Sequence, residues 1–309
     1  DGFNIHFIQV KGNGKKNFPL IITHGWPGSF LEMLPLIPML TRTSSEKEEE
    51  FAFDVIVPSM PGFGLSQKSN EDGMNAFRIA SLWAQLMDEL GYEKFAAQGG
   101  DFGAGVTTAL AMKYPEKITG IHLNYIPGSY HPVAGSEKND LNQEEIQSIK
   151  DADKWYTDSG AYAHVQKTWP LTLAYGLNDS PVALAAWITE KFYEWGDCNG
   201  NIENRFSKDE LLTSITLYWL TQTIHSSCRL YVENNRVPFH FKKGETINVP
   251  CGIAHFPKEA PFPPRKFIER VYSIRHWTDM PSGGHFAALE EPELLANDLF
   301  AFFKTISSS

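Results

Sequence analysis

The segment QGGDFGAG, from Gln98 to Gly105, decides the fold of this chain. Residues 99–103 have the spacing of the nucleophile elbow G-x-S-x-G, a sharp turn between a strand and a helix that exposes its middle side chain. An aspartate, Asp101, stands where that motif has serine. The small residues 103–105 would let the following helix approach a sheet closely. The pentapeptide alone does not distinguish a nucleophile from an Asp101 that only caps a helix. The rest of the chain must decide between these two roles.

The chain on either side of the elbow alternates between apolar runs and helical patterns. Apolar residues in the 77–90 segment recur at helical spacing, and Gly91 follows directly, which predicts a helix with a glycine cap. A second helix is expected from Phe102 to Lys113, because Pro115 cannot continue it. The apolar runs predict strands at 19–23, 53–57, 94–99 and 118–125. Such alternation indicates a mainly parallel sheet with helices on both faces and a site beyond the carboxyl ends of its strands.

The alternation stops near Pro127 and resumes near residue 241. Between these points, Ser180 and Pro181 predict the start of a helix that reaches Gly196, and a capping box of Ser207 and Glu210 predicts another. Strand patterns return at 246–255 and 270–277, and a last helix begins at Pro292 with Leu295, Leu299, Phe302 and Phe303 on one face. We therefore expect a core of residues 1–126 and 241–309, interrupted by a helical lid at 127–240. The acidic stretch at 41–50 is expected to be a solvated loop.

Composition restricts the partners. The 309 residues carry a net charge of -10, which disfavours nucleic acid and anionic membrane surfaces. No window resembles a membrane span or a signal peptide. Because the chain begins at Asp1, an upstream anchor or targeting signal stays open; for the chain as given we expect a cytoplasmic location. Cys198, Cys228 and Cys251 are far apart and are expected to be free thiols. The oligomeric state stays open, a dimer included.

A histidine and an acid are needed to act with a nucleophile at the elbow. His285 lies in a glycine-rich loop after the last predicted strand, the order in which elbow-bearing folds place their histidine. Candidate acids are Asp279, Glu259 and the pair Glu290 and Glu291. Asp279 more plausibly ends a strand, and the pair lies beside Pro292 where acids favour a helix dipole. Glu259, in the loop after the strand near Cys251, is the expected acid.

Several motifs spread over the chain, in the order of one known family, extend this picture. They are HGWPGSF (24–30), PSMPGFGLS (58–66), QGGDFG (98–103), LNDSPVALAAWITEKF (177–192), RLYVEN (229–234) and GGHFAALEEPELLA (283–296). Together they resemble the microsomal-type epoxide hydrolases of the α/β-hydrolase superfamily. The segment 126–154 is short against that pattern, and Phe102 stands where the family often has tryptophan.

The resemblance assigns roles to residues of this chain. It implies Asp101 as nucleophile, His285 as base and Glu259 as its orienting acid. The backbone N–H groups of Trp26 and Phe102 would form the oxyanion hole.

Further family features fall outside that catalytic group. Pro27, after an aromatic residue, is a candidate for a cis peptide bond. Tyr231 and Tyr162 would be the lid phenols that donate to the epoxide oxygen.

The chemistry explains why an aspartate suits the elbow. A carboxylate can open an epoxide by direct displacement, which gives an ester that activated water then hydrolyses. A serine would form an ether, which offers water no electrophilic carbon. Phenols with a pKa near 10 are plausible proton donors to the alkoxide. No metal or organic cofactor is required, and the expected partners are a small apolar epoxide and water.

Two other functions stay open. A haloalkane dehalogenase uses the same aspartyl ester but needs N–H donors for the halide, which the side chain of Phe102 lacks. A catalytically silent member would bind a small ligand in the same pocket without forming diol. Aromatic residues in the predicted lid suggest an apolar pocket; they are Trp155, Trp169, Phe192 and Trp219. Detoxification, hormone turnover and biosynthesis all stay open as the biological role.

Overall fold

The computed structural model describes residues 2–42, 51–127, 141–239, 241 and 244–307. Most of the predicted acidic loop (43–50) and much of the segment noted as short (128–140) lie outside these residues. In the described ranges, no helix combines the length and the apolar character that crossing a bilayer requires.

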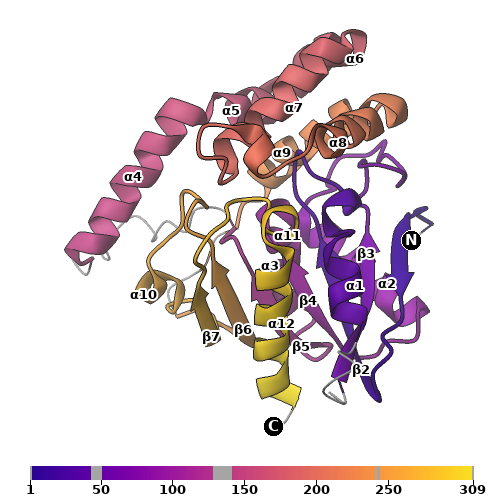
Figure 1. Cartoon of the computed structure of the whole chain (residues 1–309), viewed down its shortest axis with the longest axis vertical. Helices are drawn as coiled ribbons and strands as arrows, with labels where there is room; N and C mark the ends of the chain where they lie inside the picture. Colours follow the sequence, from indigo (N-terminus) through magenta and orange to yellow (C-terminus); the bar gives the residue numbers. More distant parts are fainter. Residues whose placement is uncertain (1, 43–50, 128–140, 240, 242–243, 308–309) are drawn as a thin grey trace.

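A seven-stranded sheet forms the centre of the molecule, in the order β1-β3-β2-β4-β5-β6-β7 (Figure 1). The first strand is antiparallel to its neighbour, and the other pairs are parallel. The strands are β1 (Phe7–Val10), β2 (Lys16–Thr23), β3 (Phe51–Pro58), β4 (Phe95–Gly99), β5 (Ile118–Leu123), β6 (Ile247–His255) and β7 (Tyr272–Asp279). This is the α/β-hydrolase fold that the sequence predicted; among its strands, the periodicity did not reveal β1.

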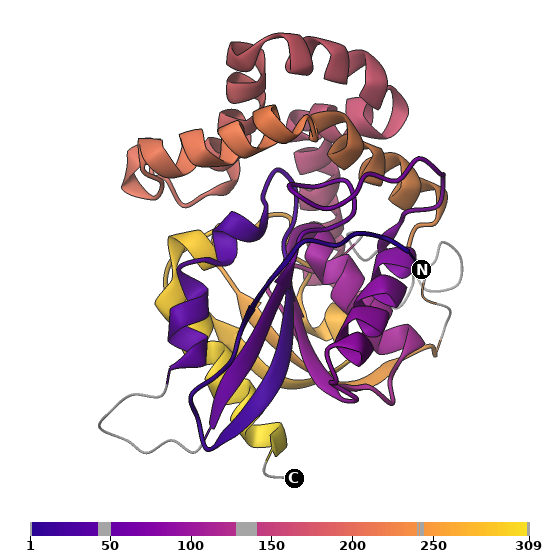
Figure 2. The same ribbon diagram turned by 90° about the vertical axis from the view of Figure 1, so that its right-hand side faces the viewer.

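Helices cover both faces of the sheet (Figure 2). On one face lie α1 (Leu36–Thr41) and α12 (Pro292–Ser307), and on the other lie α2 (Ala76–Glu89) and α3 (Asp101–Lys113). Side chains alternate along β2 accordingly, because successive residues of a strand point to opposite faces. Leu20 and Ile22 pack in the cluster under α1 and α12, whereas Ile21 packs in the cluster under α2 and α3. The predicted apolar face of α12 is fully buried, as expected.

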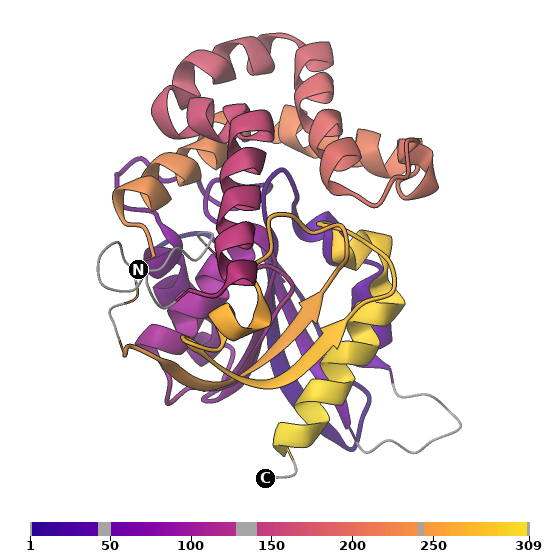
Figure 3. The same ribbon diagram turned by 90° about the vertical axis from the view of Figure 1, so that its left-hand side faces the viewer.

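A layer of helices lies over the carboxyl ends of the strands, between β5 and β6 in the chain (Figures 1 and 3). We call these helices the lid. They are α4 (Gln143–Ser159), α5 (Ala161–Thr168), α6 (Pro170–Asp179), α7 (Pro181–Trp195), α8 (Lys208–Thr221) and α9 (Ile224–Arg236). The predicted capping box of Ser207 and Glu210 opens α8. Since residues 128–140 and 240 are not described, the lid limits at 127 and 240 stay predictions.

The lid is fastened to the core at several points. In Figure 3, α4 runs down beside the short helix α10 (Arg265–Ile268). There the guanidinium of Arg270 donates to the carboxylate of Glu145 at 2.7 Å. At the other end, Phe192 of α7 stacks on Phe286 with ring centroids 4.1 Å apart. These contacts fix the lid above the loops in which the predicted site residues lie.

The topology places two loops side by side at the centre of the sheet. The chain leaves β2 toward β3 on one side and reaches β4 on the other, so β2 and β4 flank a topological switch point, where open α/β sheets bind ligands. The loop after β2 carries HGWPG, and the loop after β4 is the elbow. Short elements that the sequence did not predict complete this end of the sheet: a 3-10 helix, η1 (Phe30–Met33), and α11 (Ala287–Glu290).

Candidate active site

The elbow forms as the spacing predicts. Asp101 is the first residue of α3 and has a φ of 48°, in the left-handed region that a sharp turn requires. A Cβ at Gly103 would lie 1.9 Å from the carbonyl oxygen of Thr23, so only glycine allows α3 to approach β2 this closely. The turn therefore presents the carboxylate of Asp101 at the end of the sheet rather than using it as a helix cap.

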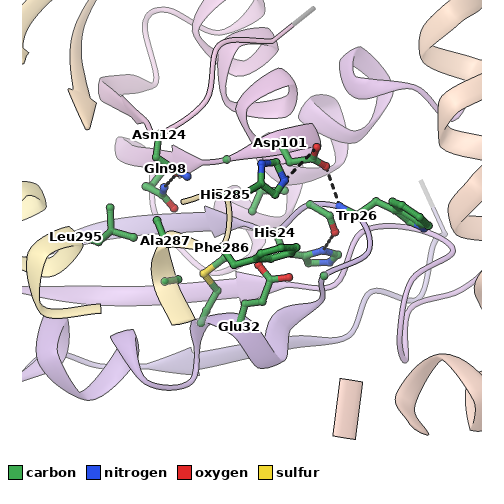
Figure 4. A pocket seen from close by; sticks show the side chains of 16 residues that line it. His24, Trp26, Glu32, Gln98, Asp101, Asn124, His285, Phe286, Ala287 and Leu295 are labelled. Atoms are coloured by element: carbon green, nitrogen blue, oxygen red, sulfur yellow. Dashed lines mark hydrogen bonds and ion pairs between the residues drawn. The ribbon is translucent and has the colours of Figure 1, made fainter. Parts of the chain in front are cut away.

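The two oxygens of Asp101 have different neighbours (Figure 4). Oδ1 accepts the backbone N–H of Trp26 at 2.8 Å. Oδ2 lies 3.6 Å from Nε2 of His285. The Trp26–Pro27 peptide bond is cis, which confirms the prediction for Pro27; a second cis bond joins Ala260 to Pro261.

The other edge of the His285 ring faces Glu259. Nδ1 of His285 lies 3.0 Å and 2.9 Å from the two carboxylate oxygens of Glu259, whose side chain is buried. The backbone N–H of His285 donates to the carbonyl of Trp195 in the lid at 3.0 Å, and the two rings are 5.1 Å apart. The imidazole is thus held between two carboxylates, with its plane fixed by the lid.

The other candidate acids have different partners. Asp279 ends β7, as expected, and its exposed carboxylate contacts His255 and the indole of Trp277. Glu290 accepts the backbone N–H groups of Asp197 and Phe286. Glu291 pairs with Arg205 and accepts from Ser282. Of the four acids considered, Glu259 alone is hydrogen-bonded to His285.

The charges around His285 change its proton affinity. Burial by itself would lower the pKa of this imidazole. The carboxylates of Glu259, Asp101 and Glu32 outweigh that effect and raise the pKa from 6.5 to about 9. The free enzyme at neutral pH therefore holds His285 as an imidazolium.

Two backbone N–H groups lie where an oxyanion hole is expected. That of Trp26 already contacts Asp101. Phe102 is the second residue of α3, where backbone N–H groups have no intrahelical acceptor. The ring of Phe102 packs edge-on against Tyr231 at 4.7 Å. The side chain of Phe102 therefore packs against the lid. This agrees with the expectation that its backbone N–H is the group that the oxyanion hole needs.

Two lid tyrosines meet over the elbow. Tyr162 of α5 stacks on the indole of Trp26 at 5.7 Å, and Tyr231 of α9 packs edge-on against the same indole at 5.6 Å. The pKa near 10 expected from sequence is wrong for both, because burial and then nearby charges raise the pKa of each phenol well above that value. Both therefore stay protonated, the form that donates a hydrogen bond.

The lid aromatics named from the sequence do not all face the site. Trp169 is 72% exposed, and Phe192 is used in the stack on Phe286. Trp26 lies next to both tyrosines instead, and Trp195 lies next to Tyr162. The three cysteines are buried free thiols, as predicted. Within the described residues, no three His, Cys, Asp or Glu side chains gather as a metal site would require.

Sequence reasoning missed three groups at this site. Glu32 lines the same cavity as Asp101 and His285, and its S-x-x-E spacing from Ser29 is a capping-box signal that could have drawn attention to it. The ring of Tyr125, just after β5, is 6.0 Å from that of His285, and burial raises its pKa well above 10. Tyr218 of the lid donates to the carbonyl of Gly28 at 2.8 Å.

His24 is a structural part of the site. It receives the backbone N–H of Met60 at Nε2 and donates from Nδ1 to the carbonyl of Gly25. Burial lowers its pKa to about 4, so the ring is neutral. It joins the loop after β2 to the loop after β3.

Comparisons with known proteins agree with this geometry. Residues 19–146 match the model of the alpha/beta hydrolase fold, and residues 1–33 match the model of the epoxide hydrolase N terminus. The chain is 39% identical to epoxide hydrolase 1 of Sus scrofa, over 98% of this chain and 72% of that protein. It is 35% identical to juvenile hormone epoxide hydrolase 2 of Ctenocephalides felis, over 98% and 70%.

Solved structures show the same relationship. The crystal structure of the juvenile hormone epoxide hydrolase of Bombyx mori superposes with a TM-score of 0.87 at 31% identity, over 99% of this chain and 77% of that one. The Aspergillus niger epoxide hydrolase gives 0.84 at 31% identity, with the same coverage. The chain thus spans about three quarters of these enzymes. It belongs to the microsomal-type epoxide hydrolases of the α/β-hydrolase fold.

Proposed function

We propose that this epoxide hydrolase converts its substrate to a vicinal diol through a hydroxyalkyl ester on Asp101. The observation that carries the proposal is the setting of the elbow carboxylate, with an N–H on Oδ1 and an imidazole beside Oδ2. Because Trp26 holds Oδ1, Oδ2 is the atom that attacks the epoxide carbon. Tyr162 and Tyr231 donate to the epoxide oxygen from the lid.

The protonation of His285 completes the first half-reaction. Attack by Asp101 breaks a ring C–O bond, forms the ester and leaves an alkoxide on the substrate. Burial raises the pKa of both phenols, which makes them weaker acids than an imidazolium beside Asp101. The imidazolium of His285 protonates the alkoxide, since ester formation removes the negative charge of Asp101 that favoured the cation. His285 is then neutral and can act as a base.

The second half-reaction is ester hydrolysis. His285, oriented by Glu259, takes a proton from water as the water oxygen attacks Cγ of Asp101. The N–H groups of Trp26 and Phe102 stabilise the oxyanion that forms on Oδ1. Collapse of the tetrahedral intermediate releases the diol, whose oxygen takes the second proton of the water. The carboxylate of Asp101 and the imidazolium of His285 are restored, so the cycle consumes one epoxide and one water.

The walls of the site favour a small apolar epoxide. The surfaces around the two phenols are the indoles of Trp26 and Trp195 and the ring of Phe102. Such surfaces bind hydrocarbon and leave the phenols as the polar contacts that orient the epoxide oxygen. The cytoplasmic location expected from the sequence stays a prediction.

One observation keeps a haloalkane dehalogenase as a second candidate. The indole N–H groups of Trp26 and Trp195 are buried and have no hydrogen-bond acceptor among the described residues. Donors of this kind could stabilise a leaving halide, a role that Phe102 cannot fill. The same two N–H groups could also bind an acceptor on an epoxide substrate.

Trapping of the ester distinguishes these functions. A Glu259→Gln variant, which slows ester hydrolysis and keeps His285 as the proton donor for ring opening, is mixed at mildly acidic pH with an aryl epoxide or with a haloalkane, and its intact mass and adduct site are measured. A stable gain equal to the whole epoxide, located on Asp101, is the expected result. An adduct from the haloalkane alone would make the chain a dehalogenase. No adduct from either compound, with binding shown by titration, would make it a ligand-binding protein.

A further inference from the structure

Lys191 is a buried cation in the lid that the proposed steps do not use. It lies near the end of α7, and its side chain is 3% exposed. Among the residues that the structure describes, no other lysine or arginine is buried. Removing an ammonium group from water is costly unless neighbouring groups replace its hydration. The neighbours of Lys191 therefore decide how its charge is stabilised and on which groups it acts.

Carboxylates at the surface are one set of neighbours. Nζ of Lys191 donates to Glu190, the preceding residue, and lies 3.8 Å from a carboxylate oxygen of Glu194. The side chains of these acids are 53% and 41% exposed. Because water screens an exposed carboxylate, these pairs contribute little to stability. A solvated lysine on α7 could form the same pairs, so they do not explain why Lys191 is buried.

Aromatic rings are the other neighbours of the ammonium. Nζ lies 4.8 Å from the ring centroid of Tyr162 on α5, and 5.8 Å from those of Trp187 and Trp195 on α7. A cation is attracted to the negative face of an aromatic ring within about 6 Å, and the attraction is stronger away from water. The indole N–H of Trp187 donates to Gln166 at 2.9 Å, which joins α7 to α5 here. The closest of the three rings is that of a phenol already assigned to the site.

Tyr162 is held by packing on several sides. Its ring stacks on the indole of Trp26 with 8° between the planes, and it lies 5.0 Å from the ring of Trp195. The ring of Tyr231, the other phenol, is edge-on to it at 6.0 Å. Lys191 adds a positive charge to this ring. Such a charge draws electron density from the phenol oxygen, which makes the O–H a stronger hydrogen-bond donor.

We propose that Lys191 positions Tyr162 and strengthens its hydrogen bond to the epoxide oxygen during ring opening. The inference rests on the proposed function. As Asp101 attacks, the ring C–O bond breaks and its electron pair stays on the oxygen to which Tyr162 donates. The ammonium stabilises this developing anion through the phenol, and the proton that completes the step still comes from His285. Ester hydrolysis develops its negative charge at the ester group of Asp101 instead, so Lys191 should have little effect on it.

The alternative role is packing by the lysine stem alone. Lys191→Met keeps an unbranched side chain of similar length and removes the charge, so a packing role would survive this change. Lys191→Arg keeps a cation that also binds over aromatic rings. The two variants therefore separate the effect of charge from the effect of shape.

The test measures ester formation and ester hydrolysis separately, by single-turnover mixing with an aryl epoxide and intact-mass analysis of quenched samples. For Lys191→Met, we expect ester formation about tenfold slower and hydrolysis within about threefold of the parent. Lys191→Arg should form the ester within about threefold of the parent rate. Ester formation at the parent rate in Lys191→Met would overturn the inference, and so would an equal loss in both variants.

A double-mutant cycle tests whether the charge acts through Tyr162. In Tyr162→Phe the hydroxyl is already absent, so adding Lys191→Met should change the rate of ester formation by less than about twofold. Losses that multiply in the double variant would show that Lys191 acts on another group or on the lid as a whole. That result would contradict the positioning role.

Lys113→Met is the matched control. Lys113 ends α3, and its Nζ lies 5.6 Å from the ring centroid of Tyr114, which is not part of the site. We expect both half-reactions in this variant to stay within about twofold of the parent. An equal slowing in the control would show that loss of any cation over a tyrosine has the effect, and would overturn a specific role for Lys191.

Two further outcomes complete the design. If Lys191→Met does not fold, Lys191→Gln also removes the charge but can still donate to the carboxylates. The same slowing of ester formation is then expected, and the parent rate would contradict the inference. If the parent forms neither ester nor diol, the proposed function itself fails. Turnover by the parent with no effect at position 191 removes only the role of Lys191.

Discussion

Nδ1 of His285 lies 2.9 Å from Oε2 of Glu259, on the edge of the ring opposite to Asp101. This contact fixes the tautomer and the orientation of the imidazole, and it helps to keep the ring charged in the free enzyme. Several measurable consequences follow from this arrangement of one imidazole between two carboxylates.

Neutralising Glu259 should impair the second half-reaction. Glu259→Gln is expected to slow ester hydrolysis at least about 10²-fold, because the ring loses both its orientation and the charge that stabilises the imidazolium. Asp279→Asn is the control, since Asp279 is exposed at the end of β7 and contacts His255 instead. Single-turnover kinetics with an aryl epoxide gives both rates. A large loss only in the Asp279 variant would reverse the assignment of the acid.

Replacing the nucleophile should abolish diol formation with the fold preserved. Asn is the suitable replacement for Asp101, because it tolerates a positive φ and keeps an oxygen for the N–H of Trp26. Diol is measured by chromatography, and circular dichroism reports the fold. The mass of the variant must be checked for deamidation, which would regenerate the aspartate. A retained rate in undeamidated protein would exclude the covalent route.

The lid phenols should act on ester formation. Tyr231→Phe is expected to slow ring opening by about 10²-fold, since the alkoxide loses a donor, and to leave ester hydrolysis nearly unchanged. Tyr162→Phe should behave in the same way, because both phenols contact the indole of Trp26. Pre-steady-state kinetics separates the two steps. A larger effect on hydrolysis would show that the phenols serve the oxyanion instead.

Ester formation should depend on pH through the imidazolium of His285. The pKa of about 9 means that the cation is present below this pH and is lost above it. The rate of ester formation should therefore be level near neutral pH and decline above about pH 9. In Glu259→Gln the decline should begin at a lower pH, because one of the charges that raise this pKa is gone. A rate that increases through pH 9 would mean that the proton comes from another group.

Asp298 should contribute to stability away from the site. This α12 residue accepts from Nε2 of His122 on β5 and of His276 on β7, at 2.8 Å and 2.7 Å. Burial alone would raise its pKa, but these hydrogen bonds outweigh that effect and lower the pKa far below 3.8. Asp298→Ala should reduce the free energy of unfolding by about 3 kcal/mol at neutral pH.

The sign of the pH effect provides a control for Asp298. A carboxyl with a depressed pKa contributes stability above its unfolded value, near 3.8, and loses it as the pH falls through the folded value. The free energy of unfolding, measured with urea, should therefore differ most between the parent and Asp298→Ala at neutral pH. This difference should decrease below about pH 4. A difference that does not change with pH would show that lost packing, not charge, is the cause.

The sequence by itself determined the local features of this protein. Glycine spacing around Asp101 specifies the elbow, because only residues without a Cβ allow the approach of α3 to Thr23. Apolar periodicity specified the strands β2–β7 and the helices α2, α3, α7, α8 and α12, since burial on one face leaves a period that can be read directly. It gave a helical lid without the individual helices α4, α5, α6 and α9. It also missed elements such as β1 and η1, which are too short to show a period.

Only the tertiary structure decided which distant groups meet. Sequence order offered several acids for His285, and the geometry places Glu259 at its ring while Asp279 points to His255. The pKa values of His285 and of the lid tyrosines also differ from those of the free side chains. Burial and neighbouring charges cause these shifts, and the residue type alone predicts neither of them. Glu32 is the clearest case. Its position in the chain is that of an ordinary cap, and only packing against Gly28 turns its carboxyl into the cavity beside Asp101.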